Sequence, residues 1–163
     1  MNVEIVPINH EHIPGFFECL DSVARERKYL RFLQAPPLES VREFVEANIT
    51  AGNAQFVALD DARVVGWCDV IPKKMEGFQH VGVLGMGLLP DYRGQGIGTR
   101  LIETTLARAK EIGLERIELD AFATNTNAIA LYEKVGFVIE GVKRNARKID
   151  GIVEDNIVMG LVF

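Results

Sequence analysis

The sequence lacks long hydrophobic runs, an excess of positive charge and a signal-like start, and each absence excludes a class of protein. No window approaches about 18 unbroken apolar residues, the length needed to span a bilayer, and the first four residues lack the basic and apolar segments of a signal peptide. Lys and Arg total 18 against 23 Asp and Glu, giving a formal charge of −5, unlike the basic footprint of nucleic-acid-binding proteins. We predict a cytoplasmic protein that binds neither a membrane nor nucleic acid.

Cysteine is also scarce, with two residues in the whole chain. Cys19 and Cys68 lie far apart in the sequence, among apolar neighbours, and fit no metal-ligand spacing. We therefore predict two buried free thiols and no metal site.

The length of 163 residues, with 48% hydrophobic and 25% charged residues, is typical of one globular domain. Neither a repeat of solenoid length nor a linker divides the chain. We predict a single domain over residues 1–163.

Hydrophobic periodicity predicts a mixed α/β (α+β) chain with a central β–α–β unit among antiparallel hairpins. Glycine inside a strand marks a bulge or the close approach of another group, and the strand at 81–89 carries Gly82, Gly85 and Gly87. Ser40 is expected to cap the second helix. The expected helices are residues 11–33, 40–49, 97–112 and 125–135, and the expected strands are residues 3–6, 56–59, 64–71, 81–89, 116–122, 138–149 and 152–163.

Residues 93–98 form a glycine-rich turn between a predicted strand and a predicted helix. The first turn of a helix has unpaired N–H groups and a partial positive charge, so such a turn binds phosphate. A P-loop is excluded because no Gly-Lys pair occurs in the chain. A dinucleotide fingerprint fails as well, because its third glycine falls on Thr99 or on Pro90.

Two segments resemble one known family. Residues 88–101, LLPDYRGQGIGTRL, are similar to the acetyl-CoA signature of the GNAT superfamily of N-acetyltransferases, with Arg93, Gly96 and Gly98 at its key positions. Residues 125–137, NTNAIALYEKVGF, resemble the second motif of the same family, at the expected distance. The likeness extends from about residue 56 to the C-terminus, whereas the first fifty residues match only in outline.

The resemblance implies a mixed central sheet of six to seven strands with a splay after the fourth, flanked by about four helices. It also implies acetyl-CoA as co-substrate, with the pantetheine arm paired to the backbone of Leu88 and Leu89 and touched by Asn125. Asn127 is a second contact or a helix N-cap, and Lys134 lies near the CoA phosphates or in solvent. The pyrophosphate is expected on the amides of Arg93, Gly94, Gln95, Gly96, Ile97, Gly98 and Thr99.

The same resemblance makes Tyr132 the general acid that protonates the departing CoA thiolate, besides contacting the co-substrate. A general base is needed because an amine with a pKa of about 8 to 10 arrives protonated and only the neutral form attacks. The position of the base in the family's ribosomal-protein enzymes falls on Asp120. Because Asp is shorter than Glu, a water relay stays open, and Glu118 is the alternative.

The acceptor pocket is expected to use Tyr29, Phe32 and Asp69. The final hairpin resembles a bacterial branch that acetylates amino acids, polyamines and related small amines, so a small-molecule amine is the predicted acceptor. A protein N-terminus or lysine, and a non-catalytic acetyl-CoA sensor, are the alternatives. The basic run at 141–151 is read as a charged edge strand, a ligand contact or part of a homodimer interface.

Overall fold

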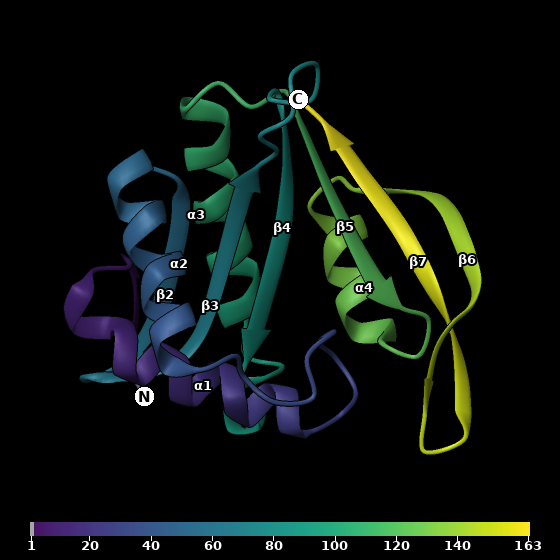
Figure 1. Cartoon of the computed structure of the whole chain (residues 1–163), viewed down its shortest axis with the longest axis horizontal. Helices are drawn as coiled ribbons and strands as arrows, with labels where there is room; N and C mark the ends of the chain where they lie inside the picture. The colour runs from purple at the N-terminus through teal and green to yellow at the C-terminus, as the bar shows by residue number, and fades with distance from the viewer. Residues whose placement is uncertain (1) are drawn as a thin grey trace.

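A seven-stranded mixed sheet runs through the computed structural model, which describes residues 2–163. Four α-helices cover its two faces (Figure 1). The helices are α1 (Ile13–Arg25), α2 (Leu38–Ala51), α3 (Ile97–Glu111) and α4 (Thr126–Lys134), with short 3-10 turns at His10–His12 and Pro90–Tyr92. The strands, in sheet order, are β1 (Val3–Pro7), β2 (Ala54–Asp60), β3 (Arg63–Pro72), β4 (Val81–Leu88), β5 (Arg116–Phe122), β7 (Ile152–Val162) and β6 (Val138–Ile149).

Neighbouring residues of β3 define the two faces of the sheet, because successive side chains of a strand point to opposite sides. The Trp67 ring packs edge-on against Phe16 of α1, with the ring centroids 5.7 Å apart. The preceding residue, Gly66, lies against Leu101 of α3. We call these the α1/α2 face and the α3/α4 face; Figure 1 shows the helices on either side of the strands.

The sheet opens between β4 and β5. These parallel strands pair at only three positions, of which Val83↔Glu118 is the last. Beyond that pair β4 stays bonded to β3 and β5 to β7, so the two ribbons diverge in Figure 1. The predicted mixed sheet, with seven strands, four helices and a splay after the fourth strand, is confirmed.

Two of the β4 glycines are positions of close approach. A Cβ on Gly82 would lie 2.4 Å from Cγ1 of Val70, and one on Gly87 would lie 2.2 Å from Cη2 of Trp67. No side chain larger than hydrogen fits there without movement of the core. The prediction of a close approach is therefore confirmed for both residues.

Two predicted helix boundaries are wrong. The first helix ends at Arg25 rather than at 33, because Arg27 takes a left-handed φ of +61° and the amide of Ala35 folds back onto the carboxylate of Asp21 (2.9 Å). The second helix begins at Leu38, so Ser40 lies inside it and does not cap it.

The predicted helix at 125–135 is found as α4, at Thr126–Lys134. Its N-cap is Asn125 rather than Asn127, and the Asn125 side chain makes no capping hydrogen bond. The cap reading of Asn127 is therefore wrong, and this exposed side chain is left for other contacts.

Cys19 and Cys68 are both buried and unoxidised, as predicted. Burial raises the pKa of the Cys19 thiol to about 12, although Arg63 and Arg93 act in the opposite direction. The pKa of Cys68 is raised further by its complete burial. Both thiols therefore stay protonated at neutral pH. Within residues 2–163, no helix combines the length and the apolar character that crossing a bilayer requires.

Candidate active site

The glycine turn presents a row of free backbone donors. Gly94 and Gly96 take left-handed φ values of +73° and +82°, and Gly96 is the N-cap of α3. None of the amides of residues 94–99 has a partner among the hydrogen bonds of residues 2–163, whereas the amide of Arg100 donates to Gly96. A Cβ on either Gly94 or Gly96 would meet nothing within 4 Å. Because α3 also has no acidic residue in its first turn, this end of the helix suits an anion.

Arg93 supports the turn from behind instead of facing an anion. Its guanidinium donates to both carboxylate oxygens of Glu26 at 2.9 and 2.6 Å, and through Nε to the carbonyl of Leu88 at 2.9 Å. It also lies 4.7 Å from the centre of the Tyr29 ring. The hydrogen bonds that Arg93 donates to Glu26 raise the pKa of Arg93 above its ordinary value. The Arg93 amide is engaged too, since it donates to the carbonyl of Pro90.

The partner Glu26 was not identified from the sequence. It lies at the end of α1, 67 positions away, and no spacing rule connects it with the turn. Tyr92 fixes the other side, because its hydroxyl donates to Asp60 at 2.6 Å. The turn is thus tied to both α1 and β2 by charged hydrogen bonds, which are stronger than neutral ones.

The backbone groups at the end of β4 are less available to a ligand than the sequence predicts. The amide of Leu89 donates to the carbonyl of Val65 at 2.9 Å, and the Leu89 carbonyl accepts from Tyr92. The carbonyl of Leu88 is taken by the side chain of Arg93. Leu89 therefore has no free N–H group for a ligand. The part of β4 that stays open lies closer to the apex of the splay, where β4 and β5 separate.

Tyr132 lies on α4, 8% exposed, with its ring edge-on to Phe137 at 5.9 Å. No hydrogen bond of its hydroxyl contributes to its pKa. Burial raises the pKa of Tyr132 well above its ordinary value, with a smaller contribution from Cys68. The phenol consequently keeps its proton throughout the physiological range and can act as a donor. Of the other α4 predictions, Asn125 is half-buried, while Asn127 and Lys134 are exposed.

Two carboxylates of β5 point to the α1/α2 face. Asp120 is exposed and accepts hydrogen bonds from Asn156 at 3.1 Å and from Lys143 at 3.5 Å. Glu118 pairs with Nζ of Lys73 at 2.8 Å and with Arg116. The Lys73 hydrogen bond is the main reason that the pKa of Glu118 is lowered. A lowered pKa makes Glu118 a weaker base.

The three predicted acceptor residues lie in two segments of the chain. Tyr29 packs under Arg93 beside the turn, while Phe32, in the same loop, is 51% exposed. Asp69 is buried in β3 at 7% exposure and accepts a hydrogen bond from Gln55.

The tip of the β6–β7 hairpin meets the α1–α2 loop. Arg27 forms an ion pair with Asp150 at 3.0 Å, and Arg147 donates to the carbonyl of Lys28 at 3.1 Å. The Arg147 guanidinium also lies 3.5 Å from the centre of the Phe122 ring. Part of the predicted basic run therefore joins the β6–β7 hairpin to the α1–α2 loop. This contact covers one side of the α1/α2 face.

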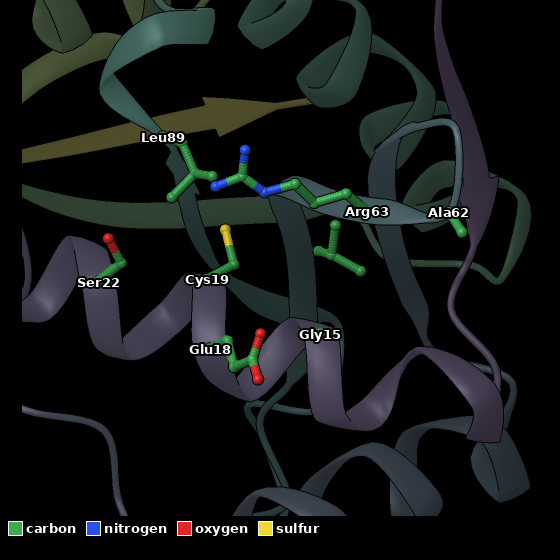
Figure 2. Close-up of a pocket in the computed structure, with 8 residues that line it drawn as sticks. Gly15, Glu18, Cys19, Ser22, Ala62, Arg63 and Leu89 are labelled. Atoms are coloured by element: carbon green, nitrogen blue, oxygen red, sulfur yellow. The ribbon is translucent and has the colours of Figure 1, made fainter.

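A separate pocket of about 220 Å³ lies between α1 and the β2–β3 turn. Figure 2 shows the Arg63 side chain extended toward Leu89 with the Cys19 thiol pointing at it. Of its lining residues only Leu89 belongs to the predicted site. The pocket is smaller than the roughly 300 Å³ or more that is usual for small-molecule sites.

The splayed sheet and the free amides at the head of α3 define a class of protein, the acetyltransferases of mixed α/β fold. Residues 20–137 match the acetyltransferase (GNAT) family, and the chain belongs to that family. The resemblance seen in the two sequence motifs is thereby confirmed.

Relatives within the family act on different acceptors. The chain is 36% identical over 96 residues to mycothiol acetyltransferase from Geodermatophilus obscurus, covering 57% of this chain and 31% of that one. It is 28% identical over 136 residues to N-alpha-acetyltransferase 30 from Schizosaccharomyces pombe, covering 83% of both. The chain spans between 31% and 54% of the length of two of the curated relatives it matches.

A solved structure shows the same fold. The phosphinothricin acetyltransferase from Sinorhizobium meliloti, in complex with acetyl-CoA, superposes with a TM-score of 0.92 at 18% identity, covering 100% of this chain and 89% of that one.

Proposed function

We propose that this chain is an acetyl-CoA-dependent N-acetyltransferase that transfers an acetyl group to a primary amine of a small molecule. The observation that carries the proposal is the row of unpartnered amides at residues 94–99, placed at the open end of a splayed strand with the protonated phenol of Tyr132 on the neighbouring helix. All elements from β1 to β7 are taken to form one catalytic domain over residues 1–163.

The residues present fit acetyl-CoA. Its pyrophosphate carries the negative charge that free amides at a helix N-terminus stabilise, and the open glycines leave room for it. The splay offers unpaired backbone of β4 to the amide groups of the pantetheine arm. Asn125, Asn127 and Lys134 lie on the α4 side, where each can contact the co-substrate.

The proposed chemistry is direct transfer between two bound substrates. A base removes one proton from the acceptor's ammonium group, and the neutral nitrogen then attacks the thioester carbon. Tyr132 donates a proton to the departing sulfur, and the nitrogen loses its second proton as the amide forms. In sum, ammonium and thioester give amide, free thiol and one proton. The position that the family resemblance gives for the base is Asp120, whose carboxylate is exposed and hydrogen-bonded to Asn156 and Lys143.

A small acceptor is favoured because the hairpin tip and the α1–α2 loop are joined over the α1/α2 face. A protein N-terminus is the second candidate, since the relative that matches 83% of this chain is named an N-alpha-acetyltransferase. Residence in the cytoplasm and a homodimer remain predictions from the sequence.

CoA release from acetyl-CoA, measured by a thiol reagent, tests the function. The panel holds amino acids and their amides, polyamines, aminoglycosides and N-terminal peptides. We expect release with one class of small amine. Release with peptides alone would shift the function to a protein acceptor. Tight acetyl-CoA binding without release would favour a sensor.

A matched pair of glycine variants tests the turn. In Gly96→Ala the left-handed φ of +82° imposes a strain of about 1–2 kcal/mol, and relief of that strain moves the amides of the turn. We expect the Kd for acetyl-CoA to rise about tenfold, equivalent to about 1.4 kcal/mol. Gly113→Ala carries the same strain, because Gly113 has a φ of +97° and an added Cβ meets nothing within 4 Å. Gly113 lies beyond the C-terminal end of α3, away from the turn. It should lower the Tm similarly and leave the Kd unchanged; equal Kd values for both variants would contradict the assigned turn.

A further inference from the structure

Asp69 is a buried carboxylate without a cation. It lies in the middle of β3, 7% exposed, and its one hydrogen bond comes from Nε2 of Gln55 at 3.4 Å. Gln55 is oriented in turn by Asn48, whose Nδ2 donates to Oε1 of Gln55 at 2.9 Å, and Asn48 accepts from Asn53 at 3.0 Å. Burying an ionisable group without an opposite charge costs free energy. Such a residue therefore does not stabilise the core. Buried carboxylates of this kind are enriched at functional sites.

The free oxygen of Asp69 faces an open strand. Asp69 is the β3 partner of Gly85 on β4, and a Cβ on Gly85 would lie 3.5 Å from Oδ1 of Asp69. Gly85 is two residues beyond Val83, the last position at which β4 pairs with β5. With no side chain on Gly85 and no β5 strand beside it, the space next to Oδ1 adjoins the apex of the splay. An acyl chain that enters along β4 from the glycine turn has its reactive end directed towards this apex.

The surroundings of Asp69 are uncharged on the elements that pack against it. Gln55 comes from β2, Asn48 from α2 and Gly85 from β4. Desolvation therefore dominates and raises the pKa of Asp69 to about 7, against a smaller lowering by Gln55. A carboxylate that titrates near neutral pH is a far stronger base than an exposed one.

Other titratable groups are near but differently engaged. The Cys68 thiol, next to Asp69 in β3, points to the opposite face and remains protonated. On the α1/α2 face of β5, Glu118 is paired with Lys73, and Asp120 is bonded to Asn156 and Lys143.

We propose that Asp69, rather than Asp120, is the general base that removes the proton from the acceptor's ammonium group, with Gly85 providing the opening through which the amine reaches it. The assignment rests on the proposed N-acetyltransferase function and concerns the same site. The O–H bond forms on Asp69 as one N–H bond of the ammonium breaks, and the proton passes to solvent when the product leaves. Gln55 is a positioning residue, because it holds the carboxylate and does not touch the amine.

The first test compares pH profiles of kcat/KM for CoA release by the wild-type protein, Asp69→Asn and Asp120→Asn. We expect the wild-type profile to have an acidic limb near pH 7, separate from the limb of the amine at higher pH. Asp69→Asn should lower kcat/KM about 100-fold and abolish the limb near 7, whereas Asp120→Asn should retain it. A wild-type rate and limb in Asp69→Asn would overturn the assignment and leave the proposed function intact, since that function is judged on the wild-type protein alone.

A second variant uses the sign of a pKa shift. The hydrogen bond from Gln55 lowers the pKa of Asp69, so Gln55→Met should move the acidic limb to higher pH. An unmoved limb would contradict the assignment.

The stability of Asp69→Asn separates a catalytic role from a structural one. Because the raised pKa makes ionised Asp69 unfavourable in the folded state above pH 7, Asp69→Asn should have a Tm at pH 8 no lower than that of the wild type. A large fall in Tm would show a structural residue.

Two further measurements do not depend on the Asp69 variant's turnover. Carbonyl ¹³C labelling of aspartate, with Asp69→Asn to assign the signal, should show Asp69 titrating at about 7 in the free protein. Titration near the ordinary value of 3.8 would overturn the proposal.

Gly85→Ala introduces a Cβ at ordinary contact distance from Oδ1 of Asp69. It should raise the acceptor's KM without changing the Kd for acetyl-CoA. Gly141→Ala, with nothing within 4 Å of the new Cβ, is the matched control, and equal KM values for both would count against the proposed opening.

Discussion

Replacing Tyr132 by Phe should lower kcat for CoA release about 100-fold, which is the lower range for losing a general acid. No hydrogen bond contributes to the pKa of the hydroxyl, and the ring contact with Phe137 is preserved in the variant. The folded protein should therefore keep its Tm and its Kd for acetyl-CoA. Steady-state kinetics at saturating acetyl-CoA, together with a binding isotherm, measure both quantities.

Tyr92→Phe removes the same atom from a tyrosine outside the reacting end and is the control. It loses the 2.6 Å hydrogen bond to the Asp60 carboxylate, so it should cost about 2 kcal/mol of stability with little loss of kcat. Wild-type turnover in Tyr132→Phe would remove the proposed acid while leaving membership of the family untouched.

Replacing Gly87 by Ala should be among the most destabilising single-methyl changes in the chain. The new Cβ would lie 2.2 Å from Cη2 and 2.6 Å from Cζ3 of Trp67. Trp67 is 4% exposed and is held on its other side by Phe16, so the ring cannot move without opening the core. Overpacking of this kind costs about 1–3 kcal/mol, and we expect the upper end, measured as the free energy of unfolding in urea.

The double variant Gly87→Ala, Trp67→Leu identifies the cause. If the clash with the indole is responsible, the second change should recover part of the loss that Gly87→Ala produces, although Trp67→Leu alone is destabilising because it leaves a cavity. Strictly additive effects of the two changes would show that the strain lies elsewhere, because residues in contact are expected to couple.

The sequence was most informative where function depends on backbone conformation and on local motifs. Left-handed φ values at Gly94 and Gly96 require glycine, so the spacing of the turn could be identified along the chain. The helix that carries Tyr132 follows from its own periodicity, and β5 was predicted with the bounds that the structure has. Helix ends were less predictable, because the end of α1 depends on the Asp21–Ala35 contact rather than on a local signal.

By itself, therefore, the sequence determined the family, the order of most elements, the phosphate-type turn and the two buried thiols. These are properties of neighbouring residues and of hydrophobic pattern. Only the tertiary structure decided that Arg93 is bound to Glu26 and that Glu118 is paired with Lys73. Only it placed the uncharged surroundings of Asp69 beside the open strand at Gly85, because the pKa of a carboxylate depends on burial and on partners that the chain brings together from distant positions.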